Sequence, residues 1–312
     1  MTPQHILVPT DFSVHADAAL SHALSLANRY EATLHLLHVV NDPGAGWYGL
    51  GDAEVQIDRL KSQAESEARE RLEGMARATE APEVRTTVVQ RVHLDVADAI
   101  EEYVDSHEID LTVTGTHGRQ GLGRLVLGSV ANALIRRAAC PVMTVRDSEN
   151  EGDSPPTVAY EEILAPIDFS EHSRRALHAA KDIAGQYGAT RHLLFVAEKR
   201  VLPTFSDTGI PGVGVVEMDP EIVENAGAAL EAFDDKVSGP SGKRACHVEK
   251  GEVAGSIVDF AATNAVDLIV MATRGLTGID RFVLGSNTER VVRKAPCPVL
   301  TVPPISGEDG DE

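Results

Sequence analysis

A glycine-rich stretch of this chain has the residue types and spacing to bind a phosphate group. Gly115 and Gly118 follow a short apolar run, and Gly128 and Ser129 precede a second apolar segment. Glycines let the backbone turn sharply and approach a ligand closely, and the unpaired N–H groups at a helix start favour an anion. The sequence therefore predicts phosphate binding in this loop, with a plain connection capped by Gly128 or Ser129 as the alternative.

Two common phosphate-binding motifs are absent from the loop. It contains no Gly-Lys pair followed by Ser or Thr, and position 126 is Val where a dinucleotide fingerprint beginning at Gly121 would need glycine. Its own spacing is Gly-x2-Gly-x9-Gly-Ser, directly after an apolar strand and followed by a helix and the sequence Ala-Cys-Pro-Val. This pattern resembles the ATP-binding signature of the universal stress protein family.

The resemblance implies an adenine nucleotide site at one edge of a sheet. The turn after the first strand and a valine at the end of the second would hold the adenine and ribose. The glycine loop would hold the triphosphate of ATP, with Mg²⁺ or Mn²⁺ shared by its oxygens. The residues implied are Pro9, Thr10, Asp11, Val39, Gly115, Thr116, Gly118, Gly128 and Ser129. From the residues alone, helix capping and ligand contact are equally good roles for Asp11. His38 is expected to be a satisfied core or strand-end histidine, not a catalyst.

The chain carries a second copy of the same pattern, with Asp168 in the place of Asp11 and the same offset of 157 residues at the other matched positions. The second set of implied nucleotide-binding residues is Asp168, Val196, Gly275, Gly285 and Ser286. This copy differs at Ala272, which stands where the first copy has Gly115. An alanine Cβ would intrude on a closely bound phosphate, so we expect the second site to be weakened or empty.

Alternating patterns in the first copy indicate strands and helices in turn. Apolar runs at 6–9, 33–40, 84–90, 111–114 and 142–145 predict strands, and segments at 13–30, 53–78, 95–107 and 130–138 predict helices. Strict alternation predicts an α/β fold with a parallel sheet and helices on both faces. The family resemblance implies an open five-stranded sheet in the order 3-2-1-4-5. The ends of the first and fourth strands then lie side by side, where open α/β sheets bind ligands.

The repeat and a polar connector predict two tandem domains of this fold. We expect a first domain over 1–146, a linker over 147–160, a second domain over 161–304 and an acidic tail over 305–312. An insertion rich in proline and glycine, roughly 198–220, occupies the place of the loop at 41–51 and is expected to flank the second site. The last strands of the two copies are expected to pair within the chain as an intramolecular pseudo-dimer, with further homodimerisation left open.

The composition argues against several classes of partner and site. Of 312 residues, 43% are hydrophobic and 24% are charged, as in globular proteins. The 28 Lys and Arg residues against 48 Asp and Glu residues give a net charge of −20, which would repel nucleic acid and anionic membranes. With no leader pattern and no apolar run of about 18 residues, we expect a cytoplasmic location. The cysteines and histidines lack metal-ligand spacing, so no metal site is predicted, and Cys140 and Cys297 are expected to be small buried residues.

No catalytic residue is predicted. The loop lacks a general base, a water-orienting Gln or Glu, and the lysine of a P-loop, all of which favour efficient hydrolysis. We therefore expect an ATP-binding regulatory protein of the stress response, with little or slow hydrolysis. One alternative is an ATP-hydrolysing or adenylating enzyme on the same fold, which the lack of a Ser-Gly-Gly-x-Asp-Ser run after the first strand disfavours. The other is a nucleotide-free partner-binding protein, which the intact glycine signature disfavours.

Overall fold

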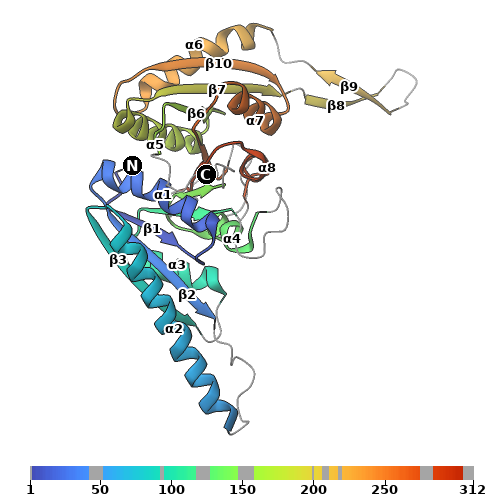
Figure 1. The fold of residues 1–312 in the computed structure, drawn as a ribbon. Coiled ribbons are helices and arrows are strands. Elements are labelled where there is room, and N and C mark those ends of the chain that lie inside the picture. Colours follow the sequence, from blue (N-terminus) through green and yellow to red (C-terminus); the bar gives the residue numbers. More distant parts are fainter. Residues whose placement is uncertain are drawn as a thin grey trace. The chain divides into compact units, whose positions relative to one another are not determined.

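The protein is described by a computed structural model in which the chain forms two compact units, divided between Ala159 and Tyr160. It describes residues 2–41, 52–91, 95–116, 127–146, 158–198, 200–205, 211–216, 220–274 and 284–304 (Figure 1). We call the unit that ends at Ala159 the first domain and the unit Tyr160–Pro304 the second domain, and each is described by itself.

In the first domain, five parallel strands lie in the order β3-β2-β1-β4-β5. The strands are β1 (His5–Pro9), β2 (Thr33–Asn41), β3 (Glu83–Arg91), β4 (Leu111–Gly115) and β5 (Val142–Val145). Ile6, Leu34 and Leu111 are fully buried, because helices cover both faces of the sheet. The predicted strand order is confirmed, and the order of the strands reverses between β1 and β4, so their carboxyl ends are neighbours.

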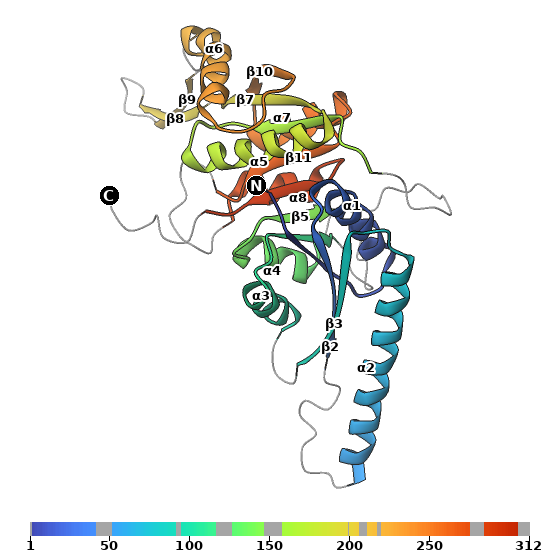
Figure 2. The same ribbon diagram turned by 90° about the vertical axis from the view of Figure 1, so that its left-hand side faces the viewer.

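Among the described residues of the first domain, helices cover both faces of this sheet (Figure 2). Helices α1 (Val14–Tyr30) and α2 (Asp52–Ala78) lie on one face, and α3 (Val96–Ser106) and α4 (Ser129–Arg137) lie on the other. The first helix packs closely because its buried stripe is made mostly of alanines at helical spacing, among them Ala16, Ala19 and Ala23. Small residues on α1 let its backbone lie close to β4.

The second domain repeats this arrangement, with parallel strands in the order β10-β7-β6-β11-β12. Its strands are β6 (Glu162–Pro166), β7 (Thr190–Glu198), β10 (Arg244–Gly251), β11 (Leu268–Ala272) and β12 (Val299–Val302). Its helices are α5 (Glu171–Tyr187), α6 (Pro220–Lys236), α7 (Val253–Thr263) and α8 (Ser286–Lys294). The duplicated fold is therefore confirmed. The expected pairing between the last strands of the two copies stays a prediction.

The insertion of the second domain contains a hairpin that the sequence analysis did not predict. Strands β8 (Arg200–Phe205) and β9 (Pro211–Val216) pair with each other antiparallel, as a two-stranded sheet (Figure 1). Its prolines and glycines indicate a loop, but both strands of a two-stranded ladder are edge strands, where proline is tolerated. In the part of the chain that the structure describes, no helix is long and apolar enough to span a membrane.

A buried ion cluster distinguishes the core of the second domain. Asp234 of α6 lies 3.2 Å from Arg191, 2.9 Å from Arg244 and 3.4 Å from Lys181, measured between carboxylate oxygens and side-chain nitrogens. Arg191 occupies the register position that Leu34 holds in the first domain, and it is 2% exposed. The Lys181 ammonium also donates to the carbonyls of Asp234 and Val237, at 2.7 Å each. One carboxylate is thus shared by three cations and helps Lys181 hold the end of α6.

Candidate functional site

The turn between β1 and α1 is held by two side-chain hydrogen bonds. Thr10 Oγ1 accepts from the amide of Phe12 at 2.9 Å, and Asp11 Oδ1 accepts from the amide of Ser13 at 3.1 Å. Phe12 has a φ of 62°, a left-handed conformation that is unusual for a bulky residue. The turn is therefore constrained at the carboxyl end of β1, where ligand contact is predicted.

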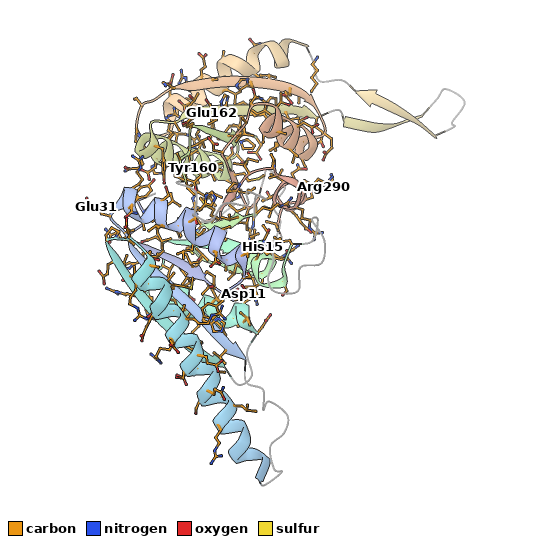
Figure 3. The ribbon with its side chains drawn as sticks, viewed as in Figure 1. Asp11, His15, Glu31, Tyr160, Glu162 and Arg290 are labelled. Carbon is orange, nitrogen blue, oxygen red and sulfur yellow. The ribbon has the colours of Figure 1, made fainter. Side chains whose placement is uncertain are left out.

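The structure separates the two roles considered for Asp11. The capping role belongs to Ser13, whose hydroxyl accepts from the amide of Ala16 at 3.4 Å at the start of α1. Asp11 instead closes the preceding turn, and its half-buried carboxylate lies at the end of β1 beyond Pro9 (Figure 3). Val39 is half-buried on β2, two residues past Leu37, the partner of Pro9. Ligand contact by Asp11 and Val39 stays a prediction.

His38 supports this turn from β2. Its Nδ1 donates to the carbonyl oxygen of Thr10 at 2.7 Å, because a carbonyl can only accept. The ring of His38 lies 4.5 Å from the ring of Phe12. The guanidinium of Arg71 lies over the same Phe12 ring, 4.1 Å from its centroid. The expectation of a satisfied strand-end histidine is confirmed. The sequence analysis missed that His38 and Phe12 position the Asp11 turn.

The end of β4 is in direct contact with α1. A Cβ built on Gly115 would lie 2.7 Å from the carbonyl oxygen of His15, so this glycine is required by helix packing. From the sequence alone, a glycine at position 115 is expected because a phosphate approaches the backbone closely. In the second domain Ala272 takes this position and is buried, so α5 leaves room for a methyl group there. The Gly115 difference therefore does not by itself indicate that the second site is weaker.

Replacing Gly115 with Ala is expected to destabilise the first domain by about 1–3 kcal/mol, because the new methyl group must push the first turn of α1 outward. The reverse change, Ala272→Gly, is expected to cost about 1 kcal/mol or less through lost burial and added backbone freedom. Chemical denaturation without nucleotide measures both. Unchanged stability of Gly115→Ala combined with lost ATP affinity would favour the phosphate explanation over helix packing.

The two ends of the glycine loop are held together. Thr116 is buried, its amide donates to the Val145 carbonyl at 2.9 Å, and its own carbonyl accepts from the amide of Gly128 at 2.7 Å. This bond sets the start of α4 beside the end of β4, at the crossing point next to β1. Gly118 lies outside the described residues, as do His117, Arg119 and Arg124 of the same loop.

The start of α4 is suited to an anion. Gly128 is its N-cap and has no side chain to accept from the first-turn amides, and that turn contains no acidic residue. Ser129, the first helical residue, is exposed. The amides and the positive end of the helix dipole therefore lack a capping or acidic side chain within the helix. This arrangement fits a phosphate group near Gly128 and Ser129.

The second domain repeats the geometry with different side chains. Asp168 Oδ1 accepts from both the amide and the hydroxyl of Ser170, at 3.0 and 2.5 Å, and Phe169 again has a positive φ of 64°. Gly285 donates to the Thr273 carbonyl at 2.9 Å, and a Cβ on Gly285 would lie 3.2 Å from that oxygen. Ser286 is exposed, Val196 is buried, and Gly275 lies outside the described residues.

Charge at the second helix start differs from that at the first. Glu289 lies in the first turn of α8, where α4 has no acidic residue. A carboxylate there offsets the helix dipole and repels a bound phosphate, although Arg293 lies 2.8 Å from it. Asp168 Oδ1 already accepts two hydrogen bonds from Ser170, so this oxygen is less able to accept another from a ligand. These two features support a weaker second site.

Two copies of one α/β unit therefore each bring an aspartate turn beside a glycine-capped helix start. The model of the universal stress protein family matches residues 2–146 and 159–303. The chain belongs to the universal stress protein family. A universal stress protein of Mycolicibacterium smegmatis is 28% identical over 97% of this chain and 98% of its own, so the tandem form extends over the whole length.

Solved structures show the same fold. A universal stress protein from Archaeoglobus fulgidus superposes with a TM-score of 0.67 at 20% identity, covering 97% of this chain and 99% of its own. Another solved structure is a universal stress protein in complex with cAMP, with a TM-score of 0.34 at 20% identity, covering 46% of this chain and 98% of its own.

The described part of this universal stress protein chain offers neither a reactive thiol nor a preformed metal cluster. Cys140 is buried as expected, whereas Cys297 is half-buried. Burial raises the pKa of the Cys140 thiol to about 11 and that of Cys297 to about 12, and it also raises the pKa of the half-buried Cys246, so these thiols stay protonated at neutral pH. No group of three His, Cys, Asp or Glu side chains is placed to hold a metal ion among the described residues.

Proposed function

We propose that the first domain binds ATP, with its phosphates at the start of α4 and its nucleoside beside the Asp11 turn, as a regulatory protein with little or slow hydrolysis. The observation that carries this proposal is the start of α4 beside the crossing point of β1 and β4, where the N-cap Gly128 gives no side-chain hydrogen bond and Ser129 is exposed. Backbone amides and a helix dipole neutralise phosphate charge without needing lysine. Mg²⁺ or Mn²⁺ shared by the phosphate oxygens would offset the rest of the charge.

The role of each residue follows from its position. Gly128 and Ser129 supply first-turn amides and a hydroxyl for phosphate, and Gly118 extends the same loop. Asp11 accepts from a ribose hydroxyl, while Val39 and Pro9 give apolar contact to the base. We also propose that the second domain, with Asp168, Val196, Gly275, Gly285 and Ser286, binds the same nucleotide more weakly because of Glu289.

A charge placed at the start of α4 separates binding from folding. Ser129→Asp is expected to lower ATP affinity at least tenfold, because the new carboxylate repels the phosphates. The same change is expected to leave the stability of the domain unaltered or raise it by about 0.3–1 kcal/mol, because an acidic residue favours a helix N-terminus. Titration calorimetry with Mg-ATP measures affinity, and thermal unfolding without nucleotide measures stability.

The matched control is Ser286→Asp at the start of α8. We expect it to leave the tight site unaffected, so that the wild-type chain and this variant both bind close to one nucleotide tightly. Unchanged affinity in Ser129→Asp would show that phosphate does not bind at α4. Two equal tight sites in the wild-type chain would contradict the asymmetry between the domains. Mass spectrometry of ligand released from freshly purified protein identifies the nucleotide independently.

A further inference from the structure

A chain of hydrogen-bonding side chains crosses the face of the first sheet that α3 covers. His5 Nδ1 lies 3.1 Å from His35 Nε2, and His35 Nδ1 lies 3.0 Å from the hydroxyl of Tyr103. That hydroxyl also lies 3.3 Å from Thr87 Oγ1. The chain thus links β1, β2, β3 and α3, and His35 at its centre is fully buried. None of these residues belongs to the candidate nucleotide site.

The hydrogen-bond partners of His35 are His5 and Tyr103, and no carboxylate among the described residues of the first domain bonds to it. On β1 it faces His5, and on α3 and just beyond it faces Tyr103 and His107. On β3 the nearest charged groups are Arg85 and Glu83, which form a surface ion pair with each other at 3.0 Å. Asp110 bonds the backbone amides of Gln4 and His5 at the start of β1. A proton on His35 would therefore place a positive charge in the core beside other bases.

The second domain contains a related chain with a different end. Glu162, labelled in Figure 3, occupies the register position of His5. Its Oε2 lies 2.6 Å from His192 Nε2. His192 Nδ1 in turn lies 3.0 Å from His247 Nε2 of β10. The aromatic ring from α7 is Phe260, which lies 5.6 Å from His192 and 4.7 Å from His247. Here a carboxylate already contacts one histidine of the pair, His192, whereas His35 has no such contact. Burial, with His192 next in effect, still lowers the pKa of His247 at the far end of this chain.

We propose that the His5–His35–Tyr103 chain makes the first domain acid-responsive, so that a proton entering it loosens α3 from β1 and β2, while Glu162 protects the second domain. This property is independent of nucleotide binding. It concerns the packing of α3 on the first sheet. The two domains differ in it because the first strand carries His5 in one and Glu162 at the same register position in the other.

The expected size of the acid-induced opening follows from the pKa of His35. Burial, with the neighbouring His5 next in effect, lowers the pKa of His35 to about 4 from an ordinary value of 6.5. The pKa of His35 is lower when α3 is packed on the sheet than when it is loosened. The packed state therefore has its full stability above pH 6.5 and loses stability as the pH falls toward 4. At pH 5 the equilibrium for opening is expected to rise about 30-fold relative to pH 8.

Hydrogen–deuterium exchange on the full chain without nucleotide tests this. After correction for intrinsic exchange rates, amides of α3 and β2 are expected to lose about 30-fold in protection between pH 8 and pH 5. Amides of the corresponding α7 and β7 are expected to change only a few-fold. Equal losses in both domains, or no loss in α3, would overturn the proposal.

Exchanging one residue between the domains gives matched variants. His5→Glu installs the carboxylate of the second domain and is expected to abolish most of the acid-induced loss in α3. Glu162→Gln is the reciprocal change and is expected to create a loss in α7 and β7, which keeps the test decisive if His5→Glu folds poorly. The double variant His35→Leu/Tyr103→Phe removes the titrating group and its partner together. An undiminished acid response of α3 in that double variant would assign the effect to another group.

Discussion

Replacing Asp234 with Ala is expected to destabilise the second domain by about 3–5 kcal/mol. The side chain is 3% exposed and is the carboxylate shared by Lys181, Arg191 and Arg244. Its removal leaves Arg191, which is 2% exposed, and Lys181, which is 6% exposed, without their counter-charge. Denaturant unfolding of the full chain, with hydrogen exchange to assign the transition to α6 and β10, measures the change.

A double variant separates lost packing from uncompensated charge. Asp234→Ala combined with Arg191→Leu places at position 191 the residue type that the first domain has at Leu34. We expect it to recover part of the lost stability, because a buried cation is removed together with its partner. Exposed Asp235, which pairs with Arg244 at the surface, supplies the control, since Asp235→Ala is expected to cost about 1 kcal/mol or less. Similar losses in the two single variants would refute the buried-charge explanation.

Replacing Tyr160 with Ala is expected to cost the second domain about 3–5 kcal/mol. The ring is 1% exposed and meets the ring of Tyr187 edge-on, with centroids 4.9 Å apart. Burial also raises the pKa of the Tyr160 hydroxyl above its ordinary value, so the group stays neutral in the core. Removing the ring leaves a cavity at the start of the domain, and thermal or chemical unfolding of the full chain reports the loss.

The adjacent residue provides a matched control for Tyr160. Glu161 is exposed, and its backbone amide, which an alanine substitution retains, bonds Asp267. Glu161→Ala is expected to change stability by about 0.5 kcal/mol or less. If Tyr160→Ala were equally mild, the ring would have to be a surface residue of a connector, as its place within the predicted linker implies.

The fold could be predicted from the sequence because its signals are local and repeated. Alternating apolar runs located the parallel strands, and the positions of the glycines located the loop after β4. Where prediction stopped short, the partner was distant in sequence. Gly115 contacts His15, and His38 contacts Thr10, so the reason for each residue type appears only once the strands are side by side.

In the candidate site, too, the local features could be predicted and the contacts between distant residues could not. The spacing of Gly128 and Ser129 predicted an anion site, and the structure places them at a helix start beside the Asp11 turn. The left-handed Phe12 could not be foreseen, because nothing in the pattern Asp-Phe-Ser marks a bulky residue for that conformation. The ion cluster around Asp234 is similar, since charged residues on α5, α6, β7 and β10 resemble surface positions until they are packed together.

The bond from Gly128 to Thr116 also bears on how this protein could diversify. Because that bond joins both ends of the intervening segment, the helix start is anchored independently of what lies between. Doubling the length of such a closed segment costs only about 0.6 kcal/mol in chain entropy. We therefore expect insertions between Thr116 and Gly128 to leave the start of α4 in place.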